Sequence, residues 1–284
     1  NHFFKKLMRN YWKIEADPPY LPERMDYLLK AKYEVTISVQ QNVMKNLHPQ
    51  ENIYWFLVNA RILAIAYQRM GQWQESLNVC QQELDVAIES SLSTLFLQAH
   101  VDLGNTYRNT GEWDKVIEEC EKAWNMSPSG FFIPLVVTPL GDAYCKTGQL
   151  DKGIDFMERW KDYAVHYGAI VECEYCLPLA EGYLAKRDLH KARANAENAL
   201  QIALTQGYPL HEAQAHRIIG EIIAPTDFSS AEEQFSQNLE VIRRIKARNE
   251  EGVTELSWGR ACQQYGDIEQ ARKHLTHAAE IFEE

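Results

Sequence analysis

The sequence has no apolar stretch long enough to cross a membrane as a helix. Such a span needs roughly 18 or more apolar residues, whereas the longest apolar run, residues 131–140, is short and contains Pro134 and Pro139. We expect this run to be a buried helix. The apolar and positive segments at the start do not follow the order of a signal peptide. The sequence therefore gives no reason to expect a membrane as a partner.

Positive charge is also scarce. The chain has 29 Lys and Arg against 40 Asp and Glu, which gives a formal net charge of −11. A nucleic-acid surface needs Lys and Arg to neutralise phosphates, so we expect no nucleic-acid partner. The same balance argues against binding to anionic membranes.

Cysteines are few, and they are not clustered as in a disulfide framework. The six are spread over the chain at positions 80, 120, 145, 173, 176 and 262. This spread fits a reducing compartment, and we predict a cytoplasmic protein. Cys173 and Cys176 form a CxxC motif, but no second ligand pair accompanies it. We expect both to pack as small apolar side chains, as do Cys80 and Cys120, which share one repeat position.

The motifs of common catalytic sites are missing too. The sequence contains no G-x-x-x-x-G-K-[ST] phosphate loop and no G-x-S-x-G nucleophile turn. His211 and His216 are five positions apart, whereas a zinc-binding helix needs histidines four apart on one face. We predict that the chain is not an enzyme and holds neither a cofactor nor a metal.

What the sequence does contain is an internal repeat. Leu-Gly-Asn-Thr-Tyr at 103–107 is followed by Gly111, and Leu-Gly-Asp-Ala-Tyr at 140–144 is followed by Gly148. Looser copies of this frame begin at positions 63, 179, 219 and 258. After each turn, small or apolar residues recur at spacings of three and four, which places them on one helical face. The pattern predicts six helix–turn–helix repeats of about forty residues each, at about 52–91, 92–129, 131–168, 169–207, 210–248 and 250–284.

The residue types in this frame have physical reasons. Gly104 and Gly141 lack a Cβ, so the paired helix can approach closely. A turn glycine suits the left-handed conformation that ends a helix, and the tyrosines supply apolar area with a polar tip. Trp73 and Trp113 follow turn glycines, and we expect them to pack at the corner between helices rather than to bind a partner. The turn glycines are at 71, 111, 148 and 266, and the tyrosines are at 67, 107, 144 and 183.

These residues resemble the tetratricopeptide repeat (TPR) family, whose pattern joins Leu-Gly, Tyr, Ala, Phe and Pro at such offsets. The copy at 103–128 matches it best. The resemblance implies an all-α fold, a right-handed α-α superhelix of about six helical hairpins. Residues 52–284 would form this solenoid. Residues 1–51 do not match the pattern, and we expect them to form a capping helix pair separated by the prolines at 18, 19 and 22.

The C-terminal half resembles a narrower group. The segments 179–184, 231–235 and 270–275 look like the C-terminal repeat arrays of large bacterial signalling ATPases and nucleotide cyclase regulators. This resemblance implies a ligand-sensing regulatory domain, which is the alternative to an interaction scaffold. Because the chain starts at Asn1 rather than Met, we expect a fragment or a trimmed chain.

The TPR resemblance implies that the first helices line a concave groove, with the residue after each Leu-Gly pair pointing into it. Asp142, Glu181 and Glu221 would then form an acidic row, which favours a basic peptide or helix as the partner; an ordinary solvated helix face is the alternative. The matching positions do not fit the Lys and Asn clamp of chaperone-tail binders. The predicted partner-binding residues are Arg61, Gln68, Asn105, Arg108, Asp142, Glu181, Arg217, Glu221 and Arg260.

Two further expectations concern the helices themselves. Pro139 and Pro178 precede the Leu-Gly frame of their repeats, so we expect these first helices to be bent or to begin late. The last helix contains Ile281 and Phe282 near its end. If both face outward, either more chain follows or two copies meet there. The sequence thus allows a monomer or a weak dimer through the C-terminal helix.

Overall fold

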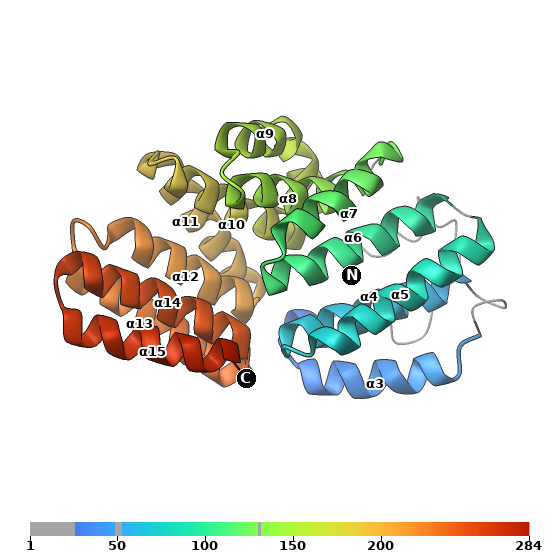
Figure 1. The fold of residues 1–284 in the computed structure, drawn as a ribbon, viewed down its shortest axis with the longest axis horizontal. Coiled ribbons are helices and arrows are strands. Elements are labelled where there is room, and N and C mark those ends of the chain that lie inside the picture. Colours follow the sequence, from blue (N-terminus) through green and yellow to red (C-terminus); the bar gives the residue numbers. More distant parts are fainter. Residues whose placement is uncertain (1–25, 49–52, 92, 130–131, 284) are drawn as a thin grey trace. The chain divides into compact units, whose positions relative to one another are not determined.

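We analysed a computed structural model, which describes residues 26–48, 53–91, 93–129 and 132–283. Throughout these ranges the secondary structure is helical, and no strand occurs in them. The helices, shown in Figure 1, are α3 (Tyr33–Lys45), α4 (Ile53–Arg69), α5 (Trp73–Ser90), α6 (Ser93–Thr110), α7 (Trp113–Asn125), α8 (Phe132–Lys146), α9 (Leu150–Tyr167), α10 (Ala169–Ala185), α11 (Leu189–Gln206), α12 (Pro209–Ile223), α13 (Phe228–Ile245), α14 (Arg248–Tyr265) and α15 (Ile268–Glu283). The expected all-α repeat fold is confirmed.

The chain divides into two compact units. The N-terminal unit comprises residues 1–68 and 72–171, and the C-terminal unit comprises residues 172–284 together with 69–71. From α4 onward, helices alternate as first and second members of hairpins. The two-part division at residue 51 stays a prediction. Most of the expected capping pair, including its three prolines, lies outside the described residues.

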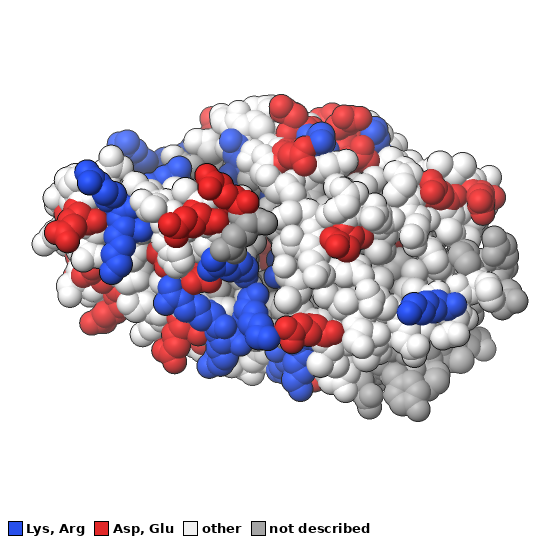
Figure 2. Space-filling model, turned by 60° about the horizontal axis from the view of Figure 1, so that its bottom comes forward, with Lys and Arg blue, Asp and Glu red and all other residues white. Residues whose placement is uncertain are grey.

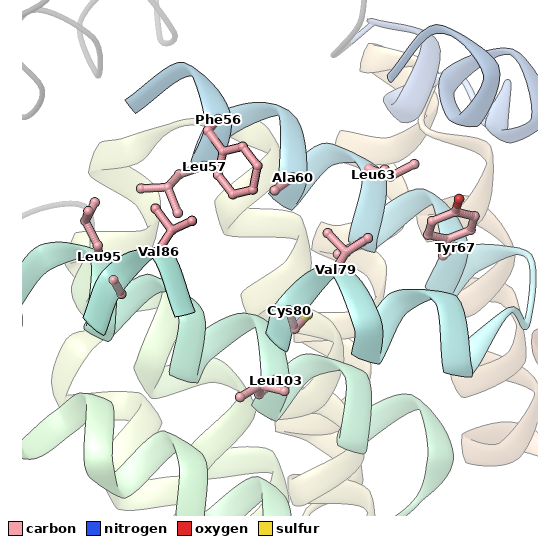
Figure 3. Close-up of a cluster of buried hydrophobic side chains, with 12 residues drawn as sticks. Phe56, Leu57, Ala60, Leu63, Tyr67, Val79, Cys80, Val86, Leu95 and Leu103 are labelled. Atoms are coloured by element: carbon pink, nitrogen blue, oxygen red, sulfur yellow. The ribbon is translucent and has the colours of Figure 1, made fainter. Parts of the chain in front are cut away.

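The core of the N-terminal unit shows how successive hairpins pack. Phe56 and Leu63 of α4 meet Val79 and Cys80 of α5, and Leu103 of α6 closes the cluster (Figure 3). All five side chains are buried. The apolar stripe of each second helix is therefore shared between its own first helix and the next one, so the repeats stabilise one another by excluding water.

The glycines behave as the repeat frame predicts. A Cβ on Gly104 would lie 2.6 Å from Cys120 Sγ, and a Cβ on Gly141 would lie 2.4 Å from Met157 Cγ, so both positions need a residue without a side chain. The turn glycines Gly111 and Gly148 have φ of +76° and +86°. In the fourth repeat Arg187 adopts φ +64° at the same place, without a glycine.

The prolines do not delay the helices that contain them. Pro139 lies inside α8 and Pro178 lies inside α10. The alternative that these helices begin late is therefore wrong. Each proline lacks a backbone N–H and so leaves one carbonyl a turn earlier without its helical partner, yet both helices continue because their faces are buried against neighbours. The described part of the apolar run is confirmed as a buried helix, since every residue from 132 to 145 is buried except Leu135, which is partly buried.

The two apolar residues near the end of α15 differ in exposure. Ile281 is 5% exposed, so it faces the core and the condition that both residues point outward is not met. Phe282 is 49% exposed. Within the described ranges, no helix is both long and apolar enough to span a membrane.

Candidate ligand-binding faces on the first helices

In the N-terminal unit, acids and arginines pair one to one between successive first helices. Arg61 Nη1 of α4 lies 2.8 Å from Asp102 Oδ1 of α6, and Arg108 Nε of α6 donates to Asp142 Oδ2 of α8 at 2.6 Å. The side chains of Asp102 and Asp142 are only 2% and 3% exposed. Each aspartate is thus neutralised from within, and these pairs leave no net charge for a partner.

A second carboxyl group lies behind the Arg61–Asp102 pair. Glu83 of α5 is fully buried, and its Oε1 accepts from Gln98 Nε2 at 3.4 Å. Burial, reinforced by the nearby Asp102, raises the pKa of Glu83 well above its usual value, although Arg61 opposes the change. Burial also raises the pKa of Asp102 to about 6, against the lowering influence of Arg61. One arginine therefore does not compensate two desolvated carboxyls.

Amide side chains complete this face. Gln68 Nε2 donates to Thr106 Oγ1 at 2.9 Å and to Ser76 Oγ at 3.3 Å. Asn105 Nδ2 donates to the carbonyl one turn earlier on α6 at 3.0 Å. Gln68 is only 3% exposed, so it joins α4 to its neighbours and has little surface to offer a partner. Asn105 and Arg108 are partly exposed.

In the C-terminal unit, one arginine serves three carboxylates. Arg217 of α12 donates through Nη2 to Glu181 Oε1 of α10 at 2.6 Å, and through Nη1 to Glu221 Oε1 on its own helix at 2.8 Å. Its Nε donates to Glu250 Oε1 of α14 at 3.3 Å. The fork geometry of the guanidinium lets one side chain reach three helices.

Among the described residues, Glu221 and Glu250 have Arg217 as their shared cation, so two carboxylates depend on one positive charge. Three carboxylates face one guanidinium, whose side chain is 9% exposed, while Glu181, Glu221 and Glu250 remain 17%, 25% and 13% exposed. Burial alone would lower the pKa of Arg217, but the three carboxylates raise it well above its ordinary value. The arginine therefore stays charged, and an excess of negative charge remains at a partly exposed surface.

Two polar groups help to hold the acids. Ser257 Oγ of α14 donates to Glu221 Oε1 at 2.6 Å, and Gln214 Nε2 of α12 donates to Glu250 Oε2 at 3.0 Å. Arg260, the last predicted groove residue, is exposed and forms no ion pair with any residue that the structure describes. The structure thus brings together Glu181, Arg217 and Glu221 but leaves Arg260 outside this cluster.

Sequence reasoning missed Glu250, Ser257, Glu83 and Gln98. Glu250 lies in the first turn of α14, and Glu83 lies on a second helix, so both are far from the Leu-Gly frame that selected the candidates. Burial of Glu83 carries no local signal, because a lone glutamate on a helix is normally solvated. Contacts between repeats, not periodicity, create both sites.

The cysteines have the packing role that we expected. Cys80, Cys120 and Cys173 are fully buried, and the thiol of Cys173 donates to the carbonyl of Ala199 at 3.4 Å. Burial raises the pKa of Cys173, which makes the reactive thiolate rarer. In the described ranges, no group of three or more His, Cys, Asp and Glu could hold a metal ion.

Charged side chains of both signs are mixed on the face drawn in Figure 2. The absence of a nucleic-acid partner stays a prediction from composition.

Comparisons with known proteins agree with this architecture. A tetratricopeptide repeat family model matches residues 61–91. The APC/C hetero-tetramer Cut9–Hcn1 superposes with a TM-score of 0.63 at 12% identity over 91% of this chain and 45% of that chain. A STAND signal-transduction ATPase with a tetratricopeptide repeat sensor, from Pyrococcus horikoshii, gives a TM-score of 0.51 at 14% identity over 91% of this chain and 40% of that one.

The apo form of RapI gives a TM-score of 0.51 at 13% identity, covering 92% of this chain and 75% of that chain. This chain therefore spans less than half the length of the first two structures that it matches. At these identities the likeness concerns the fold. The chain is an all-α helical-repeat protein with a tetratricopeptide-like fold, and it carries a recognisable tetratricopeptide repeat at residues 61–91.

Proposed function

We propose that this chain is a protein-interaction scaffold that binds a peptide or helix along its first helices. The tetratricopeptide-like fold supports an interaction role, because stacked hairpins expose long helix faces rather than one enclosed pocket. The observation that carries the proposal is the charge imbalance at Arg217, where the partly exposed carboxylates of Glu221 and Glu250 share one buried guanidinium.

The partner that fits this cluster is a basic segment. A Lys or Arg side chain approaching Glu221 and Glu250 would gain charge-assisted hydrogen bonds and relieve the repulsion among the carboxylates. The neutral one-to-one pairs of the N-terminal unit offer no such gain. Asn105 and Arg108 of that unit stay predicted contact residues.

The test neutralises the excess charge without unpairing Arg217. Glu221→Gln with Glu250→Gln leaves the 2.6 Å contact between Arg217 and Glu181 intact, so the cluster becomes a one-to-one pair. The matched control is Glu233→Gln with Glu240→Gln, which removes the same charge from exposed positions of α13. The probe is a library of short peptides that vary in Lys and Arg content.

We expect the wild type and the control to select basic peptides, and the cluster variant to bind them at least about tenfold more weakly. The affinity of the wild type should fall as salt is raised. Equal affinities for the cluster variant and its control would rule out this face as the binding site. Selection of acidic or uncharged peptides would rule out the basic partner.

The alternative function is ligand sensing within a larger signalling protein. It is favoured by the likeness in fold to the STAND ATPase with a tetratricopeptide repeat sensor. A sensor should change its radius of gyration in solution scattering when the selected peptide is added, whereas a static scaffold should not.

The expectations of a cytoplasmic location, of no enzymatic activity and of a monomer or weak dimer stay predictions.

A further inference from the structure

The carboxylates around Arg217 differ in how many of their oxygen atoms already accept hydrogen bonds. Glu250 uses both oxygens, because Oε1 accepts from Arg217 Nε at 3.3 Å and Oε2 accepts from Gln214 Nε2 at 3.0 Å. Glu181 uses Oε1, which accepts from Arg217 Nη2 at 2.6 Å. Each of these two carboxylates therefore has at least one oxygen engaged by a side chain of the same chain.

Glu221 is bonded unevenly, and its side chain is the most exposed of the three. Its Oε1 accepts from two donors, Arg217 Nη1 at 2.8 Å and Ser257 Oγ at 2.6 Å. A carboxylate oxygen has room for about two such bonds, so Oε1 is saturated. Its Oε2 accepts a hydrogen bond from no residue in the part of the chain that the structure describes. The side chain is 25% exposed, against 17% for Glu181 and 13% for Glu250, so the most accessible carboxylate has one open oxygen.

The two basic side chains differ in how they bind such an oxygen. A guanidinium group is planar and makes its strongest contact as a fork, with two parallel N–H groups on the two oxygens of one carboxylate. At Glu221 this fork would need Oε1, which Arg217 and Ser257 already fill. An ammonium group is a compact point charge with three rotatable donors. It can therefore bind Oε2 alone and needs no second open oxygen on the same carboxylate.

We propose that this cluster selects lysine over arginine, and that Ser257 sets the preference by occupying Glu221 Oε1. The inference rests on the proposed function, since it names the cation that a basic partner presents to the cluster. Ser257 lies on α14 and Glu221 on α12, so the hydroxyl comes from the neighbouring repeat. The glutamates supply the negative charge that attracts the partner, whereas the uncharged hydroxyl decides which cation fits.

The first test compares two short peptides of one sequence, with lysine at every basic position in the first and arginine at the same positions in the second. Isothermal titration calorimetry measures both affinities at one salt concentration, because salt screens exposed charges. We expect the wild type to bind the lysine peptide about three- to tenfold more tightly than the arginine peptide. Glu221→Gln should bind both peptides more weakly and without a preference, because the open carboxylate oxygen is then lost.

The second test removes the hydroxyl without changing the charge. Ser257→Ala leaves Glu221 Oε1 with Arg217 as its donor, so a guanidinium of the peptide can form the fork. The preference for lysine should then disappear or reverse, through tighter binding of the arginine peptide. Ser257→Thr keeps a hydroxyl and should keep the preference. The matched control is Ser229→Ala, because Ser229 is exposed on α13 and forms no hydrogen bond with Arg217 or Glu221 among the described residues.

The outcomes separate this inference from the proposed function. If the wild type binds both peptides more tightly than Glu221→Gln does, but binds arginine as well as lysine or better, the selectivity is overturned and the proposed function stands. If neither peptide distinguishes the wild type from Glu221→Gln, both are overturned. A lysine preference that Ser257→Ala leaves unchanged would overturn the role of Ser257. Circular dichroism checks that each variant keeps the helix content of the wild type.

Discussion

The two units place charged residues at the same kind of contact, between neighbouring first helices, but they balance them differently. In the N-terminal unit each buried aspartate has its own arginine, as in Arg108–Asp142. In the C-terminal unit three glutamates contact the same arginine, Arg217. The comparison teaches that an acidic row read from sequence is not yet a binding surface. Only a carboxylate whose negative charge is not neutralised by an arginine of the same chain can attract a positively charged ligand.

The largest expected change in stability comes from removing the shared arginine. Arg217→Met should destabilise the protein by about 3–5 kcal/mol, because Glu221 and Glu250 would be left close to Glu181 without their shared cation. Arg108→Met should cost much less, since it strands one aspartate and the arginine is partly exposed. Urea unfolding followed by circular dichroism measures both. Arg193→Met, at an exposed pair on α11, is the control and should change little.

The pH dependence of Arg217→Met sharpens the same point. Carboxylates that lose their cation hold their protons more tightly, so lowering the pH toward about 5 should recover part of the lost stability. A variant that is equally unstable at pH 5 and pH 7.5 would show that repulsion among the glutamates is not the cause.

A second comparison concerns the close contacts inside the hairpins. Gly141→Ala should cost about 1–3 kcal/mol, because the new methyl group would overlap Met157. Gly148→Ala meets no atom within 4 Å and is strained only by its φ of +86°, so it should cost about 1 kcal/mol. Thermal and urea unfolding of the two variants compare the loss of stability caused by steric overlap at Gly141 with the loss caused by backbone strain at Gly148. Equal losses would mean that the helices separate easily at Gly141.

The buried carboxyls of the N-terminal unit predict a pH effect of defined sign. The pKa of Asp102 is raised to about 6 and that of Glu83 is also raised. Groups with raised pKa contribute stability that is fully present below their unfolded pKa, about 4, and that is lost as the pH rises through the folded value. Glu83→Gln should therefore stabilise the protein by about 1 kcal/mol at pH 8 and by less at pH 5. Unfolding at several pH values measures the difference, and a pH-independent effect would contradict it.

The smallest expected effect concerns a contact that recurs in both units. Lys152 lies 3.6 Å from the ring centroid of Tyr144, and Lys191 lies 4.9 Å from that of Tyr183. Lys152→Met should cost about 0.5 kcal/mol, and Lys191→Met less, because the cation–π attraction falls with distance. Precise thermal unfolding checks the order. The reverse order would show that geometry does not control this contact.

Much of the fold was predictable because it is local and repeated. The Leu-Gly frame located the close contacts at Gly104 and Gly141, and the turn glycines located the left-handed turns. Even the irregular fifth turn lies where the spacing required, with Asp227 accepting from the backbone of Ser230 to begin α13. Pro178 was interpreted less well: local rules favour a helix that begins late or bends, but α10 begins at Ala169 and continues through Pro178, and the bend stays a prediction.

The candidate site was predictable only in part. Asp142, Glu181 and Glu221 were selected by register, and the structure shows that each is paired with an arginine. Glu250 was missed because its role is the contact with Arg217 of α12. The local pattern of α14 does not show that α12 lies beside it. The sequence left open whether Ile281 and Phe282 face outward, and the structure shows Ile281 buried and Phe282 exposed.

The sequence by itself determined the repeat length, the helical class and the positions where helices must touch, because these depend on periodicity and on side-chain size within one hairpin. The tertiary structure alone decided which charges are left over and which apolar residues stay uncovered. Those two properties are sums over several helices from different repeats, and the electrostatic and desolvation energies that set them depend on distances through space rather than along the chain.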